Sequence, residues 1–209
     1  MLIPRVKICG LTRVADALDA VSAGADAIGL VFYEKSTRHV SLEMAREIVR
    51  ASGPFVTTVG LFVNPEADNV QQVIAETGIS LLQFHGDESE PFCSGFNRPY
   101  IKAIRMSPQL DISLMVDQFS SASGLLFDAW NPEKYGGTGQ TFDWQRLPQQ
   151  PAFPLILAGG LNPQNVAEAV ASVRPYAVDV SGGVESAPGE KSSQLVKQFI
   201  HNAKAGVLS

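Results

Sequence analysis

The feature that most constrains this chain is a repeated alternation of short, uninterrupted apolar runs with segments of helical spacing. Uninterrupted apolar runs are typical of strands that are covered on both faces. The runs that we predict as strands are Val6–Cys9, Ala27–Phe32, Phe55–Val63, Leu81–Phe84, Tyr100–Ile104, Leu125–Phe127, Leu155–Leu157 and Ala177–Val180. The predicted helices that follow them are Ala15–Val21, Leu42–Val49, Ala67–Ala75, Glu88–Ser94, Leu110–Phe119, Phe142–Leu147, Pro163–Val173 and Ser192–Ala203.

Eight strand–helix pairs in 209 residues predict an α/β fold, the (β/α)₈ TIM barrel, as a single domain over residues 1–209. An open, doubly wound sheet is the alternative at this level. Thr12, Ser41 and Asn162 stand where helix caps are expected, and Pro163 would then occupy the first position of its helix. Asn64-Pro65-Glu66 repeats that signal before the third helix.

Charge and cysteine content narrow the class of protein. The net charge is −5 and no basic cluster occurs, so we expect no nucleic-acid surface. The apolar runs are too short to cross a membrane, and two cysteines do not form a disulfide framework in a chain of this size. We therefore expect a soluble, cytoplasmic protein with reduced thiols and no membrane partner.

The carboxyl end of the first predicted strand brings a thiol and a cation together. Active sites of (β/α)₈ barrels lie at this end of the strands. Alternation along a strand puts Lys7 and Cys9 on one face, and a nearby cation favours the thiolate by lowering the thiol pKa. The alternative is that Cys9 is a small buried hydrophobic residue.

Three other polar residues stand at strand ends. Asp128 directly follows the sixth apolar run, where desolvation would let it hold a proton near neutral pH. A loop cap is the alternative for Asp128. His85 ends the fourth strand, and Asp179 shares a face of the eighth strand with Ser181. For His85 and Asp179 a structural role is the alternative to substrate binding.

Arg38 and three glycine-rich segments predict anion binding. Arg38 follows the second strand, where a guanidinium could hold a carboxylate through two parallel bonds; a solvated arginine is the alternative. The segments after the sixth, seventh and eighth strands suit a phosphate, because glycine lets backbone N–H groups approach it; ordinary turns are the alternative. Their residues are Gly137, Thr138, Gly139, Gly159, Gly160, Ser181, Gly182 and Gly183. No dinucleotide, Walker or metal-ligand motif occurs, so we predict no cofactor and no metal.

Taken together, the motifs resemble the phosphoribosylanthranilate isomerase family over nearly the whole chain. The resembling segments are VKICGLTR, ADAIGLVFYEKSTRHVS, VGLFVN, LLQFHG, LLFDAW, YGGTGQTFDW, LAGGLNPQNV and RPYAVDVSGGVE. The resemblance implies Cys9 as general base, Asp128 as general acid and Arg38 as the holder of the anthranilate carboxylate. It also implies phosphate binding by the three glycine-rich segments. Gly182 stands where the family often has serine, which removes one hydroxyl but leaves the backbone N–H.

The implied reaction is an Amadori rearrangement of a small phosphosugar–anthranilate substrate in tryptophan biosynthesis, a step that needs one acid and one base. Lys7, His85 and Asp179 complete the predicted substrate site without a defined role. The alternatives are another phosphosugar barrel, such as a histidine-pathway isomerase or indole-glycerol-phosphate synthase, and a catalytically silent binding module. Monomer and homodimer both remain open.

Overall fold

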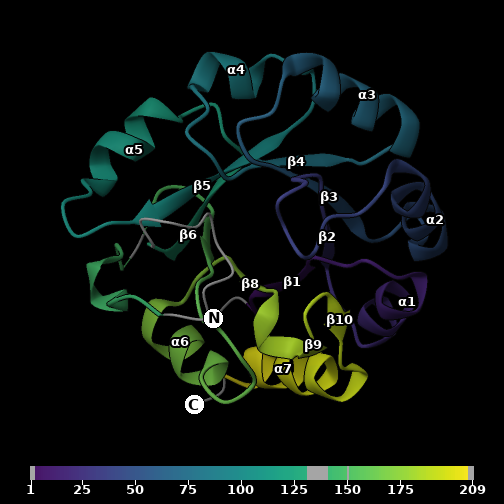
Figure 1. Cartoon of the computed structure of the whole chain (residues 1–209). Helices are drawn as coiled ribbons and strands as arrows, with labels where there is room; N and C mark the ends of the chain where they lie inside the picture. Colours follow the sequence, from purple (N-terminus) through teal and green to yellow (C-terminus); the bar gives the residue numbers. More distant parts are fainter. Residues whose placement is uncertain (1–2, 131–140, 150, 207–209) are drawn as a thin grey trace.

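The barrel follows directly from the pairing of the strands. In the computed structural model, which describes residues 3–130, 141–149 and 151–206, the strands close in the order β1 to β8, and every neighbouring pair is parallel (Figure 1). The predicted (β/α)₈ barrel is thereby confirmed, and the open doubly wound sheet is excluded. The strands are Arg5–Cys9, Ala27–Val31, Thr57–Phe62, Leu81–Phe84, Tyr100–Met106, Gly124–Ala129, Leu155–Leu157 and Ala177–Val180.

Helices cover the outside of the barrel, as Figure 1 shows along the barrel axis. They are α1 (Val14–Ser22), α2 (Leu42–Ser52), α3 (Ala67–Thr77), α4 (Glu90–Ser94), α5 (Ile112–Gln118), α6 (Val166–Val173) and α7 (Ser193–Ala205). A short 3₁₀ helix, η1 (Trp144–Arg146), follows β6 in place of a full helix. Large apolar residues fill the layer between helices and sheet, including the fully buried Phe62, Phe84, Phe127 and Phe199. Burying one such side chain stabilises the fold by about 1.5–3 kcal/mol.

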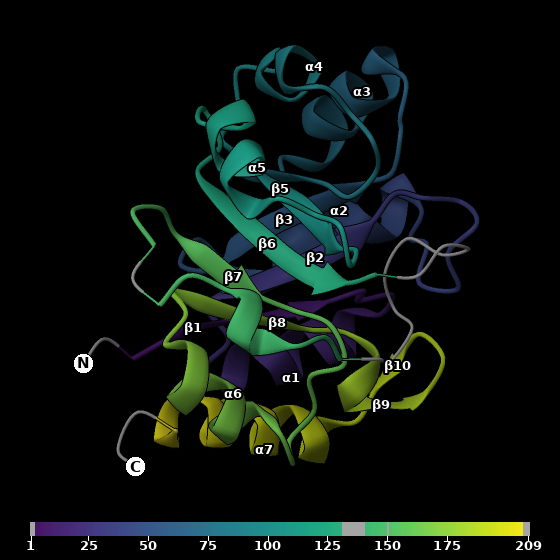
Figure 2. The same cartoon turned by 90° about the vertical axis from the view of Figure 1, so that its left-hand side faces the viewer.

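The segment after β8 contains structure that the sequence pattern did not predict. A 3₁₀ turn, η2 (Gly182–Val184), leads into an antiparallel hairpin of β9 (Glu185–Ala187) and β10 (Glu190–Lys191). Figure 2 shows this hairpin at the same end of the barrel as the tip of β6. Thr12 is not the cap of α1, because its hydroxyl donates to the carbonyl of Gly189 (2.7 Å) and so ties the β1 loop to the hairpin.

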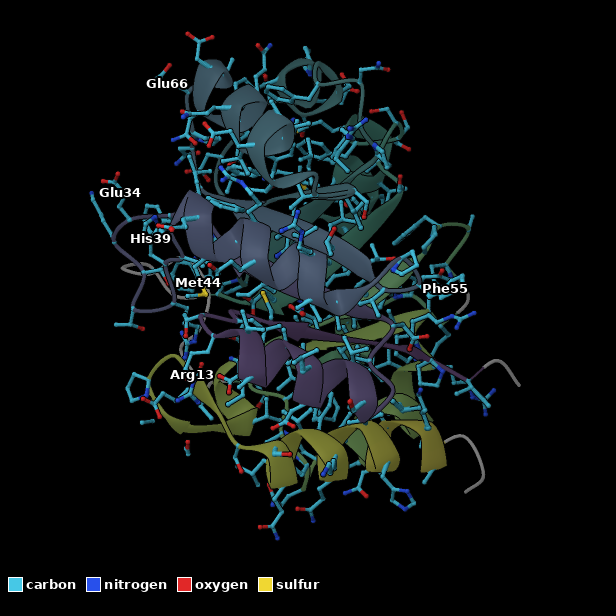
Figure 3. All side chains as sticks on the ribbon, turned by 90° about the vertical axis from the view of Figure 1, so that its right-hand side faces the viewer. Arg13, Glu34, His39, Met44, Phe55 and Glu66 are labelled. Atoms are coloured by element: carbon cyan, nitrogen blue, oxygen red, sulfur yellow. The ribbon has the colours of Figure 1, made fainter. Side chains whose placement is uncertain are left out.

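Several element boundaries differ from the predicted ones, and two of the differences have a clear cause. Helix α6 begins at Val166 rather than Pro163, because the Asn162 side chain accepts N–H bonds of a preceding turn. Strand β3 begins at Thr57, since pairing with β2 starts there, and Phe55 lies in the turn before it with 98% of its surface exposed. Figure 3 shows Phe55 at the opposite end of the barrel from Glu34 and His39. The predicted cap Ser41 is confirmed, since its side chain accepts from Met44 N.

The barrel interior contains both apolar and polar residues, and β6 and β8 contribute to both groups. Around β5 to β8 the inward residues form a buried apolar cluster of Ile101, Ala103, Leu126, Ile156, Ala158 and Ala177. Inward positions of β1, β4, β6 and β8 instead carry Lys7, Gln83, Asp128 and Asp179, all buried. Buried polar groups cost free energy unless they are paired. These buried polar residues therefore indicate a binding or catalytic site rather than residues that only fill the barrel.

Candidate active site

A cavity of about 900 Å³ opens at the carboxyl ends of the strands. This is within the size range of pockets that hold small molecules. Its walls come from the carboxyl ends of β1, β2, β3, β4, β6, β7 and β8 and from the residues that follow these strands. Among the predicted site residues, those that line it are Cys9, Arg38, His85, Asp128, Gly159, Gly160, Asp179, Ser181, Gly182 and Gly183. Gly137, Thr138 and Gly139 lie outside the described residues, and Lys7 is not among the residues that line the cavity.

Cys9 lies next to a buried ion pair between Lys7 and Asp179. Lys7 and Asp179 are register partners on β1 and β8, and Lys7 Nζ donates to Asp179 Oδ1 at 2.8 Å. Burial lowers the pKa of Lys7, but the charges of Asp179 and Cys9 outweigh it and raise that pKa above its ordinary value. The raised pKa favours the charged form of Lys7 beside the thiol.

The thiol pKa shows that the prediction from charge alone was wrong. Burial raises the pKa of Cys9 and outweighs the lowering by the charge and hydrogen bond of Lys7. The charge of Asp179 also raises the pKa of Cys9, while the charge of Lys191 lowers it. The sequence could identify the cation but not the degree of desolvation, so it predicted a lowered pKa.

Gly29 makes room for the sulfur. It is the register partner of Cys9 on β2. A Cβ placed on Gly29 would lie 2.7 Å from Cys9 Sγ and 3.1 Å from both Cys9 Cα and Lys7 Nζ. These separations are too short for a side chain, so the glycine is a steric requirement of the thiol site. Sequence analysis missed Gly29, although its place in the middle of an apolar strand was an available signal.

The Asp128 carboxyl group is held in one orientation. Its Oδ1 accepts the backbone N–H of Ala129 (2.8 Å), and its Oδ2 lies 3.1 Å from Nε2 of His85. The His85–Asp128 contact is close enough for an ion pair, yet Nε2 has no hydrogen-bond geometry to any described residue. Gly159 has a φ of +80°, and a Cβ there would lie 2.6 Å from the Ala129 nitrogen and 3.0 Å from Asp128 Oδ1. Backbone therefore packs directly against the carboxyl group.

Gln83 extends this contact into the barrel. Its Nε2 lies 3.3 Å from Nδ1 of His85, and its Oε1 is buried without a hydrogen-bond partner among the described residues. When the Gln83 amide donates to Nδ1, the ring proton is on Nε2, the atom beside Asp128. Gln83 was missed by sequence analysis, although it shares a strand face with His85.

Arg38 reaches the cavity but is not free in it. Its Nε donates to Glu185 Oε1 (2.7 Å) and its Nη2 donates to Glu185 Oε2 (2.8 Å). Glu185 also accepts from Lys191 Nζ (2.8 Å). Burial works against the charged carboxylate, but the hydrogen bonds and charges of Arg38 and Lys191 lower the pKa of Glu185. The alternative of a solvated surface arginine is excluded, while Glu185 and Lys191 are partners that sequence analysis did not identify.

The glycine segments after β7 and β8 bring backbone close to the cavity. Gly159 and Gly160 both have positive φ, +80° and +63°, a region that favours glycine. A Cβ on Gly183 would collide with the Leu161 carbonyl, so the two loops are packed against each other. Ser181 and Gly182 open the 3₁₀ turn η2 on the same wall. These loops have the close packing and backbone freedom that an anion site needs.

The loop that carries His85 is anchored by a second buried ion pair. Lys102 Nζ donates to Glu88 Oε2 (2.9 Å) and to the Gly86 carbonyl (2.6 Å). Glu88 in turn accepts the backbone N–H groups of Gly86 and Asn64. Gly86, which follows His85, is thus held through its carbonyl by Lys102 and through its N–H by Glu88.

The described part of the chain contains neither a cluster of metal-binding side chains nor a membrane-spanning helix. Within residues 3–130, 141–149 and 151–206, no three His, Cys, Asp or Glu side chains gather as metal ligands. No helix among these residues is long and apolar enough to cross a membrane. Both cysteines are free and buried, and burial raises the pKa of Cys93 to about 12.

The chain is similar to known proteins in both sequence and fold. Residues 6–202 match the family model described as N-(5'phosphoribosyl)anthranilate (PRA) isomerase. The chain belongs to this family. The resemblance inferred from the sequence motifs is confirmed.

Individual family members match along nearly their full length. The N-(5'-phosphoribosyl)anthranilate isomerase of Cellvibrio japonicus is 55% identical over 195 residues, which cover 93% of this chain and 91% of that protein. The phosphoribosyl anthranilate isomerase structure from Thermotoga maritima has 43% identity and a TM-score of 0.89, covering 97% and 99% of the two chains. Another family structure contains reduced 1-(o-carboxyphenylamino)-1-deoxyribulose 5-phosphate; it has 39% identity and a TM-score of 0.82, with the same coverage.

Proposed function

We propose that this protein isomerises N-(5'-phosphoribosyl)anthranilate to 1-(2-carboxyphenylamino)-1-deoxyribulose 5-phosphate in tryptophan biosynthesis. The observation that carries the proposal is that Cys9 and Asp128 line one cavity together with Arg38 and the glycine loops after β7 and β8. This set offers a base, an acid, a carboxylate holder and a phosphate site. Family membership supports the same substrate.

In the proposed mechanism Asp128 acts first, as general acid. Its carboxyl group protonates the furanose ring oxygen, the bond from that oxygen to C1′ breaks, and an iminium forms between C1′ and the anthranilate nitrogen. The contacts of Asp128 with Ala129 N–H and His85 fix the direction in which the proton is delivered. Positioned acids of this kind contribute about 10²–10⁴-fold to a rate.

Cys9 then acts as general base. Its thiolate removes the proton from C2′, and the electron pair of that C–H bond neutralises the iminium to give an enolamine. Gain of a proton at C1′ and loss of the C2′ hydroxyl proton give the ketone. Two protons are gained and two are lost, so the reaction balances without a redox partner. The charge of Lys7 stabilises the thiolate form of Cys9.

The two ends of the substrate are assigned to different groups of the site. We propose that Arg38 binds the anthranilate carboxylate and that the phosphate lies against Gly159, Gly160 and Ser181–Gly183. Gly137–Gly139 belong to the same proposal by family resemblance. Lys7, His85 and Asp179 act by holding Cys9 and Asp128 in place. Reduced, unpaired cysteines support a cytoplasmic location, and the acidic net charge favours a small molecule over a nucleic acid.

The test is turnover by Cys9→Ala and Asp128→Asn variants. We expect each to lose about 10²–10⁴-fold in kcat, because each removes one proton-transfer group. Cys93→Ala is the matched control, since it removes the other buried thiol, which is not among the residues that line the cavity. Thermal unfolding of every variant checks that the fold is retained. Near-complete activity in either test variant would refute the assigned role, and ligand binding by the wild type without turnover would favour a binding module.

A further inference from the structure

Lys191 is a buried cation that the proposed mechanism does not use. Its side chain is 1% exposed, and its Nζ donates to Glu185 Oε1 (2.8 Å), to the Ser181 carbonyl (3.1 Å) and to Ser181 Oγ (3.4 Å). An ammonium has three donors, so the protein itself saturates this one. Lys191 is also absent from the cavity lining. It therefore has no donor left for a ligand and acts only through its neighbours.

Those neighbours restrict how Arg38 can bind a carboxylate. A guanidinium has five N–H groups, and Glu185 takes the Nε–H and one N–H of Nη2. The groups that remain are the two N–H of Nη1 and the second N–H of Nη2, at the end of the side chain. A ligand carboxylate can form two parallel bonds only with this end. Glu185 thus leaves only the Nη1–Nη2 end of Arg38 for two parallel bonds to a ligand carboxylate.

Backbone on both sides keeps Arg38 in this position. A Cβ on Gly10 would lie 2.6 Å from Arg38 Cδ, and a Cβ on Gly182 would lie 3.0 Å from Arg38 Nη2. The aliphatic part of the side chain therefore packs against one loop and the guanidinium against another. Because Ser181 is bonded to Lys191, the second of these loops is held by the same ammonium that holds Glu185.

The charges explain why a second cation is needed. Arg38 and Glu185 form a neutral pair, which attracts an anion weakly. Lys191 brings the net charge of the three residues to +1, in a place where burial limits screening by solvent. Without Lys191, a carboxylate bound by Arg38 would also face Glu185 as an uncompensated like charge.

We infer that Lys191 is a positioning residue for the substrate carboxylate, acting through Glu185 to orient Arg38 and to keep the cluster cationic. The inference rests on the proposed function, because the proposed substrate supplies the carboxylate. The predicted effect is on affinity for the carboxylated part of the ligand rather than on proton transfer.

The test compares two probes by titration calorimetry: reduced 1-(o-carboxyphenylamino)-1-deoxyribulose 5-phosphate and its phenylamino counterpart, which lacks the carboxylate. We expect Lys191→Met to weaken binding of the first probe about 10- to 100-fold, as expected when one partner of a buried charge pair is lost. Binding of the second probe should change less than about threefold on the same scale. The matched control is Lys204→Met, which removes an exposed ammonium bonded to Gly24 outside the cavity and should leave both affinities unchanged.

A double variant separates charge from folding. Glu185→Gln combined with Lys191→Met restores a net charge of +1, now carried by Arg38 alone, so it should bind the carboxylated probe more tightly than Lys191→Met does. Equal weakening of both probes by Lys191→Met, or no weakening of either, would overturn the inference while leaving the proposed function intact. Failure of the wild type to bind the carboxylated probe would overturn the proposed function itself.

Discussion

Replacing Gly29 by alanine would place a methyl group against the thiol that we propose as the base. The added Cβ would lie 2.7 Å from Cys9 Sγ, whereas unstrained contacts between heavy atoms of this kind are about 3.5–4.0 Å. The sulfur, or the two strands, must therefore shift by about 1 Å. Gly29 and Cys9 are paired within one ladder, so the backbone yields little.

The structure gives magnitudes for both stability and rate. Overpacking of this kind costs about 1–3 kcal/mol, and the lower entropy of the unfolded alanine chain offsets about 0.4–1 kcal/mol. We expect a net loss of about 1–2 kcal/mol in unfolding free energy, or a drop in Tm of about 2–8 °C for a chain of this size. A 1 Å misplacement of a reacting group costs about 100-fold, so kcat/KM should fall by about that factor.

The assay combines steady-state turnover with thermal unfolding, and two further variants make it decisive. Gly95→Ala is the control, because its Cβ would meet only ordinary contacts at 3.4 Å. In a Cys9→Ala background the sulfur is absent, so Gly29→Ala should cost less stability than in the wild type; this is a double-mutant cycle. Wild-type kcat/KM in Gly29→Ala, or the same stability cost in both backgrounds, would refute the steric reasoning.

Two more predictions concern buried cations. Lys7→Met removes the charge and hydrogen bond that lower the thiol pKa, so the pKa of Cys9, already raised by burial, should rise further. Thiolate absorbance in an ultraviolet pH titration should then appear at higher pH than in the wild type, and an unchanged midpoint would contradict this. Lys102→Met leaves Glu88 buried without its cation and should cost about 3–5 kcal/mol in urea unfolding. Loss of the exposed ion pair in Arg46→Met should cost less than about 1 kcal/mol, and similar costs for the two variants would be evidence against a special role of burial.

Local pattern was sufficient to predict eight strand–helix pairs and the location of the main polar groups, while the pairing of the strands in the structure excluded the open sheet. Strand ends could be read from apolar runs, and parallel strands bring their carboxyl ends to one face. Cys9, Arg38, Asp128 and the glycines after β7 and β8 were therefore expected at a common mouth, where the structure places them. The position of a residue along its strand and the order of the strands are both encoded locally.

The partners of these groups could not be predicted, because they depend on contacts between distant segments. Arg38 and Glu185 are 147 residues apart in the chain, and Lys7 and Asp179 are 172 apart. The hairpin that supplies Lys191 has no periodic signal of its own. The sequence around Arg38 does not indicate that Glu185 already binds the Nε and Nη2 groups of its guanidinium.

What the sequence by itself determined is the alternation that closes the barrel and the residue types at its mouth, since both follow from side-chain periodicity. Only the tertiary structure decided the direction of the Cys9 pKa shift, the space that Gly29 leaves for the sulfur and the orientation of Arg38. Each of these depends on burial or on distances between strands. Burial and distance are properties of the closed barrel as a whole, and no single segment specifies them.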